Sequence, residues 1–195
     1  MRKVILASGS PRRKMLLEWA EVDFEVVVSD ADESFSSSLM PAEVAVSIAK
    51  KKNHAVVDLL QNKLTDSIII SADTIVVLEN EIIGKPVDKN DAIAIIQKLS
   101  GKKHQVITAV NIRDDKKDIH FYDTTEVVFH ELSIDQITHY VEQYKPYDKA
   151  GAYAIQEWIG VVGIHSIHGD FYNVMGLPVS KVLKVLHEDF HFSRA

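Results

Sequence analysis

Apolar residues recur along this chain in two alternating patterns. Short runs rich in β-branched residues, typical of buried strands, lie at 3–7, 24–28, 67–71 and 74–79. Segments whose apolar positions have helical spacing lie at 11–20, 41–60 and 88–99. Alternation of these two patterns predicts an α/β domain.

The second half of the chain carries a different, strand-rich pattern. Residues 104–113 and 118–130 predict two long strands, and the charged turn between them indicates an antiparallel hairpin. Helices are expected over 133–144, with its first serine as the cap, and from about 178 to 187. Parallel and antiparallel signals together predict a mixed, elongated sheet flanked by helices, with two lobes around a cleft.

Composition narrows the class of protein. The 22 Lys and Arg residues against 28 Asp and Glu give a formal net charge of −6, which argues against a general nucleic-acid or membrane-surface binder. The chain has no cysteine, so disulfides, thiolate nucleophiles and Cys-ligated zinc are excluded. No signal-peptide pattern and no apolar stretch of roughly 18 residues is present. We therefore expect a soluble, cytoplasmic protein with no membrane or nucleic-acid partner.

The stretch 4–13 is the most informative, because an apolar run gives way to serines, a glycine and two arginines. Pro11 at the first helical position, after small hydroxyl residues, points free backbone N–H groups at one place. Arg12 and Arg13 add forked donors suited to phosphate or carboxylate oxygens. An ordinary strand-to-helix turn, with Ser10 as N-cap and two solvated arginines, explains the same residues equally well.

Acidic residues adjoin two of the apolar runs. Asp30, Asp32 and Glu33 follow the run 24–28 and suit a hard divalent cation, although a solvated acidic loop is the alternative. Asp73 is flanked closely by strand sequence, so it is expected at a strand end or buried with a partner. It is the best single candidate for a catalytic acid, holding a metal or taking a proton from water. A structural carboxylate is the alternative.

Two lysine segments and one segment of small residues add candidates. Lys85 lies in a restrained turn between a glycine and a proline, from which its ammonium can be aimed at a phosphate. The run Lys50–Lys52 is ambiguous, since a solvated helix face is the default for at least two of the three. In 148–156, Tyr153 can stack or hydrogen-bond and Gln156 can read a base edge, or the segment is a packing bend.

Seven segments taken together resemble the Maf family of nucleoside triphosphate pyrophosphatases. In order and with matching gaps, they are Ala7–Arg13, Ser29–Glu33, Ser71–Thr74, Gly84–Pro86, Leu99–Gly101, Asp148–Gln156, and Gly169–Asp170 with Gly176–Pro178. The resemblance implies one Maf-like domain over 1–195, with a fold related to that of the inosine triphosphate pyrophosphatases and often a homodimer. It also implies hydrolysis of a nucleoside triphosphate to the monophosphate and pyrophosphate, dependent on Mg²⁺ or Mn²⁺.

The resemblance further implies roles for single residues. Asp73 matches the proton acceptor and Glu33 a metal or water ligand, so both are expected to hold the metal. The phosphate-binding set matches Ser8, Ser10, Arg13, Lys52 and Lys85, with Lys52 favoured in its run by its spacing from Ala49. The arginine, threonine and glutamine that mark the subgroup acting on dTTP and UTP match Arg12, Thr74 and Gln156.

The chain departs from the family pattern at two places. His168 stands where many members have an acid, and Glu157–Trp158 replaces a more usual glycine-rich sequence, which could alter the loop near the base. The expected function is hydrolysis of dTTP and UTP, with removal of non-standard or modified nucleotides as one use. Two alternatives stay open: a non-catalytic nucleotide-binding regulator of cell division and septum formation, and a purine pyrophosphatase of the inosine triphosphate type.

Overall fold

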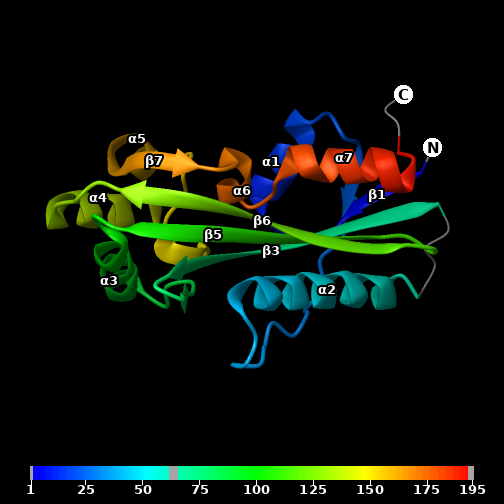
Figure 1. Cartoon of the computed structure of the whole chain (residues 1–195), viewed down its shortest axis with the longest axis horizontal. Helices are drawn as coiled ribbons and strands as arrows, with labels where there is room; N and C mark the ends of the chain where they lie inside the picture. Colours follow the sequence, from blue (N-terminus) through cyan, green and yellow to red (C-terminus); the bar gives the residue numbers. More distant parts are fainter. Residues whose placement is uncertain (1, 62–65, 193–195) are drawn as a thin grey trace. The chain divides into compact units, whose positions relative to one another are not determined.

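The computed structural model describes residues 2–61 and 66–192, and it shows a mixed sheet flanked by helices (Figure 1). The sheet has seven strands in the order β2-β1-β3-β5-β6-β7, with β4 paired to β3. The strands are β1 (Lys3–Leu6), β2 (Phe24–Val26), β3 (Ser67–Leu78), β4 (Glu81–Ile83), β5 (Lys103–Arg113), β6 (Asp118–Phe129) and β7 (Ile164–His168). The helices are α1 (Pro11–Trp19), α2 (Pro41–Leu59), α3 (Lys89–Leu99), α4 (Ile134–Tyr144), α5 (Trp158–Gly163), α6 (Phe171–Met175) and α7 (Val179–Phe190), with the short 3₁₀ helix η1 (Ala150–Ala152).

Strand directions confirm the mixed α/β class. β1 pairs in parallel with both β2 and β3, whereas β4 runs antiparallel to β3 and β7 antiparallel to β6. The residues of β3 are buried along almost the whole strand, as its near-continuous apolar sequence requires. β5 and β6 are neighbours joined by the turn at 114–117, where the Asp114 N–H donates to the Lys117 carbonyl at 3.0 Å.

The chain forms two compact units. Unit 1 comprises residues up to Asp73, Thr108–Asp123 and Gly176 onward, and unit 2 comprises Thr74–Ile107 and Thr124–Met175. The long strands β3, β5 and β6 contribute residues to both units. Assignment of the chain to one domain stays a prediction.

Unit 1 packs helices on both sides of its strands. α2 lies along one side and α1 and α7 along the other (Figure 1). Val56 and Val57 of α2 form a core cluster with Ile5 and Ile69 of the strands. Burial of this stripe, rather than helix propensity alone, keeps α2 on the sheet.

Unit 2 contains a helix pair, α3 and α4, that pack against each other. Asp88 caps α3 by accepting from the Asp91 N–H at 2.9 Å. Ser133 caps α4 as predicted, accepting from the Gln136 N–H at 3.2 Å, while the Gln136 side chain accepts from the Ser133 N–H. Fully buried Tyr140 lies on the inner face of α4.

Most predicted elements agree with the structure, with two corrections. The runs 67–71 and 74–79 were expected as separate strands, and they are one continuous strand, β3, with Asp73 inside it. The last helix continues to Phe190, about a turn beyond its predicted end. Sequence periodicity also left α5, β7 and α6 unpredicted, because each has only five or six residues.

Candidate functional site

Four charged side chains of unit 1 form what we call the charged group: Arg13, Glu33, Lys52 and Asp73. Lys52 on α2 lies between the two acids, with its Nζ 2.7 Å from Asp73 Oδ1 and 2.9 Å from Glu33 Oε1. These acids come from separate elements, since Asp73 is on β3 and Glu33 is in the loop before α2. The fold therefore brings together residues that the sequence could only propose one by one.

Asp73 is buried in the middle of a strand, with only 8% of its surface exposed. A carboxylate in such a place is costly unless it is paired, and the Lys52 ammonium supplies the partner. Glu33, by contrast, has a side chain that is 51% exposed. The group thus has one fixed, buried carboxylate and one at the surface.

Arg13 is the buried cation of the charged group. Its Nε donates to the Gly176 carbonyl at 2.8 Å, and its Nη1 donates to Ser8 Oγ at 3.0 Å. Burial lowers the pKa of Arg13 below its usual value and the nearby positive charge of Arg12 acts in the same direction, while Asp73 and Glu33 act against it. The guanidinium still carries its charge at neutral pH, so the site holds a permanent, oriented cation.

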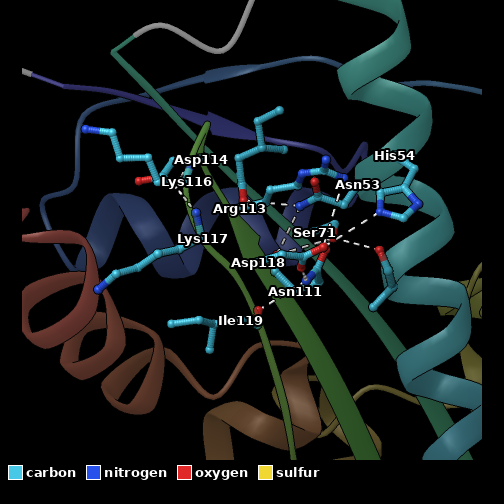
Figure 2. A network of polar contacts seen from close by, with 12 residues as sticks. Asn53, His54, Ser71, Asn111, Arg113, Asp114, Lys116, Lys117, Asp118 and Ile119 are labelled. Atoms are coloured by element: carbon cyan, nitrogen blue, oxygen red, sulfur yellow. Dashed lines mark hydrogen bonds and ion pairs between the residues drawn. The ribbon is translucent and has the colours of Figure 1, made fainter. Parts of the chain in front are cut away.

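Hydrogen bonds from the side chains of Asn53 and Ser71 hold α2 to β3 (Figure 2). Asn53 Nδ2 donates to the Ile69 carbonyl at 3.2 Å and to the Asn111 carbonyl at 3.3 Å. Ser71 Oγ donates to the Ala49 carbonyl at 2.7 Å. Helix and strand are thereby aligned at the point where Lys52 meets Asp73.

Asn53 was missed by the sequence analysis, although a signal was present. It lies four residues after Ala49 on the buried stripe of α2, where its neighbours are apolar, and it is fully buried. A polar residue on such a stripe needs partners, and here they are strand carbonyls. Asn111 continues the network by donating to Asp118 Oδ1 at 2.5 Å and to the Ile119 carbonyl at 3.1 Å.

The remaining candidates lie in unit 2. Thr74 is half-buried on β3, and Lys85 is exposed in the turn after β4. The Gly84 carbonyl accepts from the Gly151 N–H at 3.1 Å, so the turn that carries Lys85 is bonded to the segment that carries Gln156. Gln156 is exposed, as a residue that reads a ligand must be.

Tyr153 is far more buried than a residue that stacks on a base would be. Only 5% of it is exposed, its hydroxyl hydrogen-bonds to His104 Nε2 at 2.8 Å, and its ring meets those of His104 and Phe129 edge to face. Burial raises the pKa of the Tyr153 hydroxyl and lowers the pKa of His104 to about 4. Both side chains are therefore neutral, and substrate binding by Tyr153 stays a prediction.

The predicted residues thus fall into two sets. Unit 1 brings together Ser8, Arg13, Glu33, Lys52 and Asp73, with the Ser10 N–H donating to Ser8 Oγ at 3.3 Å and Arg12 acting on Arg13 through its charge. Unit 2 holds Thr74, Lys85, Tyr153 and Gln156. The roles assigned to these residues from sequence stay predictions.

The two acids of the charged group are the ligands expected for the divalent cation. Among residues 2–61 and 66–192, no group of three or more His, Cys, Asp or Glu side chains could hold a metal ion. The carboxylates of Glu33 and Asp73 do converge on one point, now contacted by Lys52 Nζ. Mg²⁺ is often held by one or two carboxylates, with substrate phosphates and waters completing its shell. These two acids therefore fit a cation that arrives with a nucleotide.

Fold and site together define a mixed α/β protein whose charged group suits a phosphorylated ligand. The model of the family described as Maf-like protein matches residues 3–189, and the chain belongs to this family. The dTTP/UTP pyrophosphatase of Cytophaga hutchinsonii is 48% identical over 188 residues, covering 96% of this chain and 84% of that protein. That of Flavobacterium psychrophilum is 46% identical over 190 residues, covering 96% and 95%. That of Bacillus cereus is 44% identical over 188 residues, covering 96% of each.

Two further findings concern similar solved structures and membrane-spanning helices. The solved Ham1 protein of Staphylococcus aureus aligns with a TM-score of 0.48 and 14% identity, over 66% of this chain and 72% of that one. A search of the described part of the chain for a helix long and apolar enough to cross a membrane finds none. The homodimer and the cytoplasmic location stay predictions.

Proposed function

We propose that this protein hydrolyses dTTP and UTP to the nucleoside monophosphate and pyrophosphate. The observation that carries this proposal is the charged group, in which Lys52 contacts Asp73 and Glu33 beside the buried Arg13. Its support from outside the structure is that three relatives, 44 to 48% identical over nearly the whole chain, are dTTP/UTP pyrophosphatases.

The reaction sets two demands on the site. Water attacks the α-phosphorus, the bond from that phosphorus to the α,β-bridging oxygen breaks, and one proton leaves the water as pyrophosphate departs. We infer that Asp73 takes this proton, and its support is that it is a paired carboxylate in a largely buried site. Arg13, Lys52 and Lys85 offset the charge that develops on the leaving pyrophosphate, and Ser8 and Ser10 complete the phosphate-binding set.

We further propose that catalysis depends on Mg²⁺ or Mn²⁺ held by Glu33 and Asp73. The bound ion would neutralise phosphate charge and polarise a phosphoryl oxygen. Because the chain offers the ion only two carboxylates at this point, metal affinity should be low without nucleotide and rise when the triphosphate is present.

Base selection is assigned to a different set of residues. Arg12, Thr74 and Gln156 carry the preference for thymine and uracil, by the resemblance described above. Gln156 suits this task chemically, since its amide presents both a donor and an acceptor to a base edge. Substitution of Gln156 should therefore change the order of substrates more than the maximal rate.

The proposal is tested by a panel of nucleoside triphosphates assayed for pyrophosphate release with Mg²⁺ or Mn²⁺. The panel comprises dTTP, UTP, CTP, ITP, XTP and 7-methyl-GTP, and we expect dTTP and UTP to be hydrolysed fastest. Binding of these nucleotides without pyrophosphate release would favour the regulator. Faster hydrolysis of ITP or XTP would favour the purine pyrophosphatase.

Asp73→Asn tests the catalytic role of Asp73 directly. The amide keeps the size of the side chain but cannot accept the proton, so turnover should fall by roughly a thousandfold or more. The fold should survive, as checked by circular dichroism and thermal unfolding. Normal pyrophosphate release by a folded Asp73→Asn protein would remove Asp73 from the mechanism.

A further inference from the structure

Residues 148–157, which we call the recognition segment, present a single side chain to solvent over most of their length. Residues 151–155 are all buried, and Gln156 is the one exposed residue between 151 and 160. Gly151 and Ala152 both adopt left-handed backbone conformations, with φ of 70° and 56°. A non-glycine residue holds such a conformation only when its surroundings impose it, so the segment is closely constrained.

Close packing constrains the segment at Gly151 and at Ile155. A Cβ at Gly151 would lie 2.9 Å from Val76 Cγ2, and a Cβ at Gly160 would lie 1.7 Å from the Ile155 carbonyl oxygen. Neither position has room for a larger residue. The backbone on either side of Gln156 therefore packs directly against its neighbours.

A polar network centred on Tyr140 also contacts the segment. The Tyr140 hydroxyl accepts from the Ala154 N–H at 3.1 Å and donates to Glu157 Oε2. The other Glu157 oxygen lies 3.7 Å from Lys149 Nζ, which also contacts Asp148 Oδ1 at 2.8 Å. Residues on both sides of Gln156 are thus tied to one hydroxyl of α4.

This network accounts for a departure noted in the sequence. Glu157 replaces a glycine-rich continuation, and its carboxylate is the acceptor for Tyr140 and the second partner of Lys149. The Lys149 side chain is only 10% exposed, so its charge requires such partners. The Lys149 and Glu157 charges belong to no step of the proposed hydrolysis and still lie beside Gln156.

We propose that Tyr140, Lys149 and Glu157 are positioning residues that hold Gln156 to read the edge of a pyrimidine, and so set base selectivity. The inference rests on the proposed function. Uracil presents an acceptor at O4 and a donor at N3, whereas cytosine presents a donor and an acceptor at those places. Discrimination depends on hydrogen-bond geometry, and a fixed backbone limits the positions from which the Gln156 amide can reach the base edge.

The test compares kcat/KM for UTP and CTP in wild-type protein, Tyr140→Phe and Glu157→Gln. Tyr140→Phe removes both hydrogen bonds of the hydroxyl and keeps the ring. We expect it to lower the UTP-to-CTP ratio by about tenfold, mainly through a higher KM for UTP, with kcat for UTP changed less than about threefold. Glu157→Gln, which keeps the size of the side chain, should lower the ratio by about threefold.

Two further variants separate positioning from general stability. Ser133→Ala removes the N-cap of the same helix and should lower the melting temperature while leaving the ratio unchanged. Gln156→Ala should abolish the preference for UTP, and adding Tyr140→Phe to it should change the ratio no further. An unchanged ratio in folded Tyr140→Phe, or the same loss in the Gln156→Ala background, would overturn the proposal.

Failure of the proposed function gives a different result from failure of this inference. If wild-type protein binds UTP without releasing pyrophosphate, the hydrolysis proposal fails. Selectivity is then measured by calorimetry, as the ratio of the Kd values for CTP and UTP. If wild-type protein does not prefer UTP over CTP in either assay, this inference fails even when hydrolysis is observed.

Discussion

The charged group of unit 1 and the recognition segment of unit 2 are built in opposite ways. The charged group collects side chains from α1, α2, β3 and a loop, and one of its acids is half exposed. The recognition segment is ten consecutive residues, of which 151–155 are all buried, and Gln156 is exposed directly after them. Charge interactions weaken slowly with distance, whereas a base-edge hydrogen bond fails within a few tenths of an ångström. We expect the first region to tolerate small displacements and the second not to.

After Asp73→Asn, the largest effect is expected for Lys52→Met in the charged group. Without its ammonium, Glu33 and Asp73 repel each other and the triphosphate loses a cation, so kcat for UTP should fall about a hundredfold, or about 3 kcal/mol in the barrier. Lys51→Met is the matched control, because Lys51 contacts only Asp32 and the Ser34 carbonyl among the described residues. Similar losses in both variants would show that the group acts through general positive charge.

The second effect concerns His104, which supports Tyr153 in the recognition segment. The pKa of His104 is lowered to about 4 by burial, so between pH 6.5 and 4 the unfolded chain takes up a proton that the folded protein refuses. Stability should fall as the pH falls through this window, by roughly 3 kcal/mol in all and about 2 kcal/mol between pH 7 and 5.

Urea unfolding at pH 7, 6 and 5 measures this dependence. His104→Gln should remove most of the slope, whereas substitution of the exposed His54 should keep it. A wild-type stability that stays flat over this range would show that His104 takes up its proton in the folded protein.

The third effect tests how closely Gly160 packs against Ile155 of the recognition segment. Gly160→Ala places a methyl group on the Ile155 carbonyl, so we expect a loss of about 2 kcal/mol, or roughly 4–8 °C in melting temperature. Selectivity for UTP over CTP should fall with it. Gly84→Ala is the control for melting temperature, since an added Cβ there meets nothing within 4 Å. Equal melting temperatures for the two variants would contradict the tight packing.

Sequence reasoning served the two regions differently. Asp73 and Arg13 could be proposed because charged residues beside strand and helix signals are unusual. Lys52 was singled out in its lysine run only by the family resemblance, and the structure brings the three together. The predicted helices and the 104–130 hairpin followed from long periodic patterns.

The supports of the recognition segment could not be predicted in this way. Tyr140 and His104 contact it across some 14 and 49 positions of sequence, and no local pattern encodes such distances. Glu157 was recognised only as a departure, because its partners Tyr140 and Lys149 are defined by tertiary packing. Of the two positions expected for Asp73, the strand end was wrong and burial with a partner was confirmed: Lys52 makes a buried acid tolerable inside a strand.

The smallest effect on activity is expected for Asn53→Ala, and it sharpens the comparison most. Asn53 is as buried as Tyr140, and both side chains make two hydrogen bonds that align an element of their region. The Asn53 amide donates both of its bonds, whereas the Tyr140 hydroxyl accepts one and donates one. Loss of the amide leaves the Ile69 and Asn111 carbonyls each without one donor, so stability should fall by about 1–2 kcal/mol. Because the Lys52–Asp73 attraction tolerates a small shift of α2, kcat for UTP should fall no more than about threefold and the UTP-to-CTP ratio should not change.

Tyr140→Phe should show the reverse, with selectivity lost and kcat kept. If Asn53→Ala instead reduces kcat by more than tenfold at temperatures where it is fully folded, the charged group needs the same exact placement as the recognition segment, and the distinction between the two regions fails.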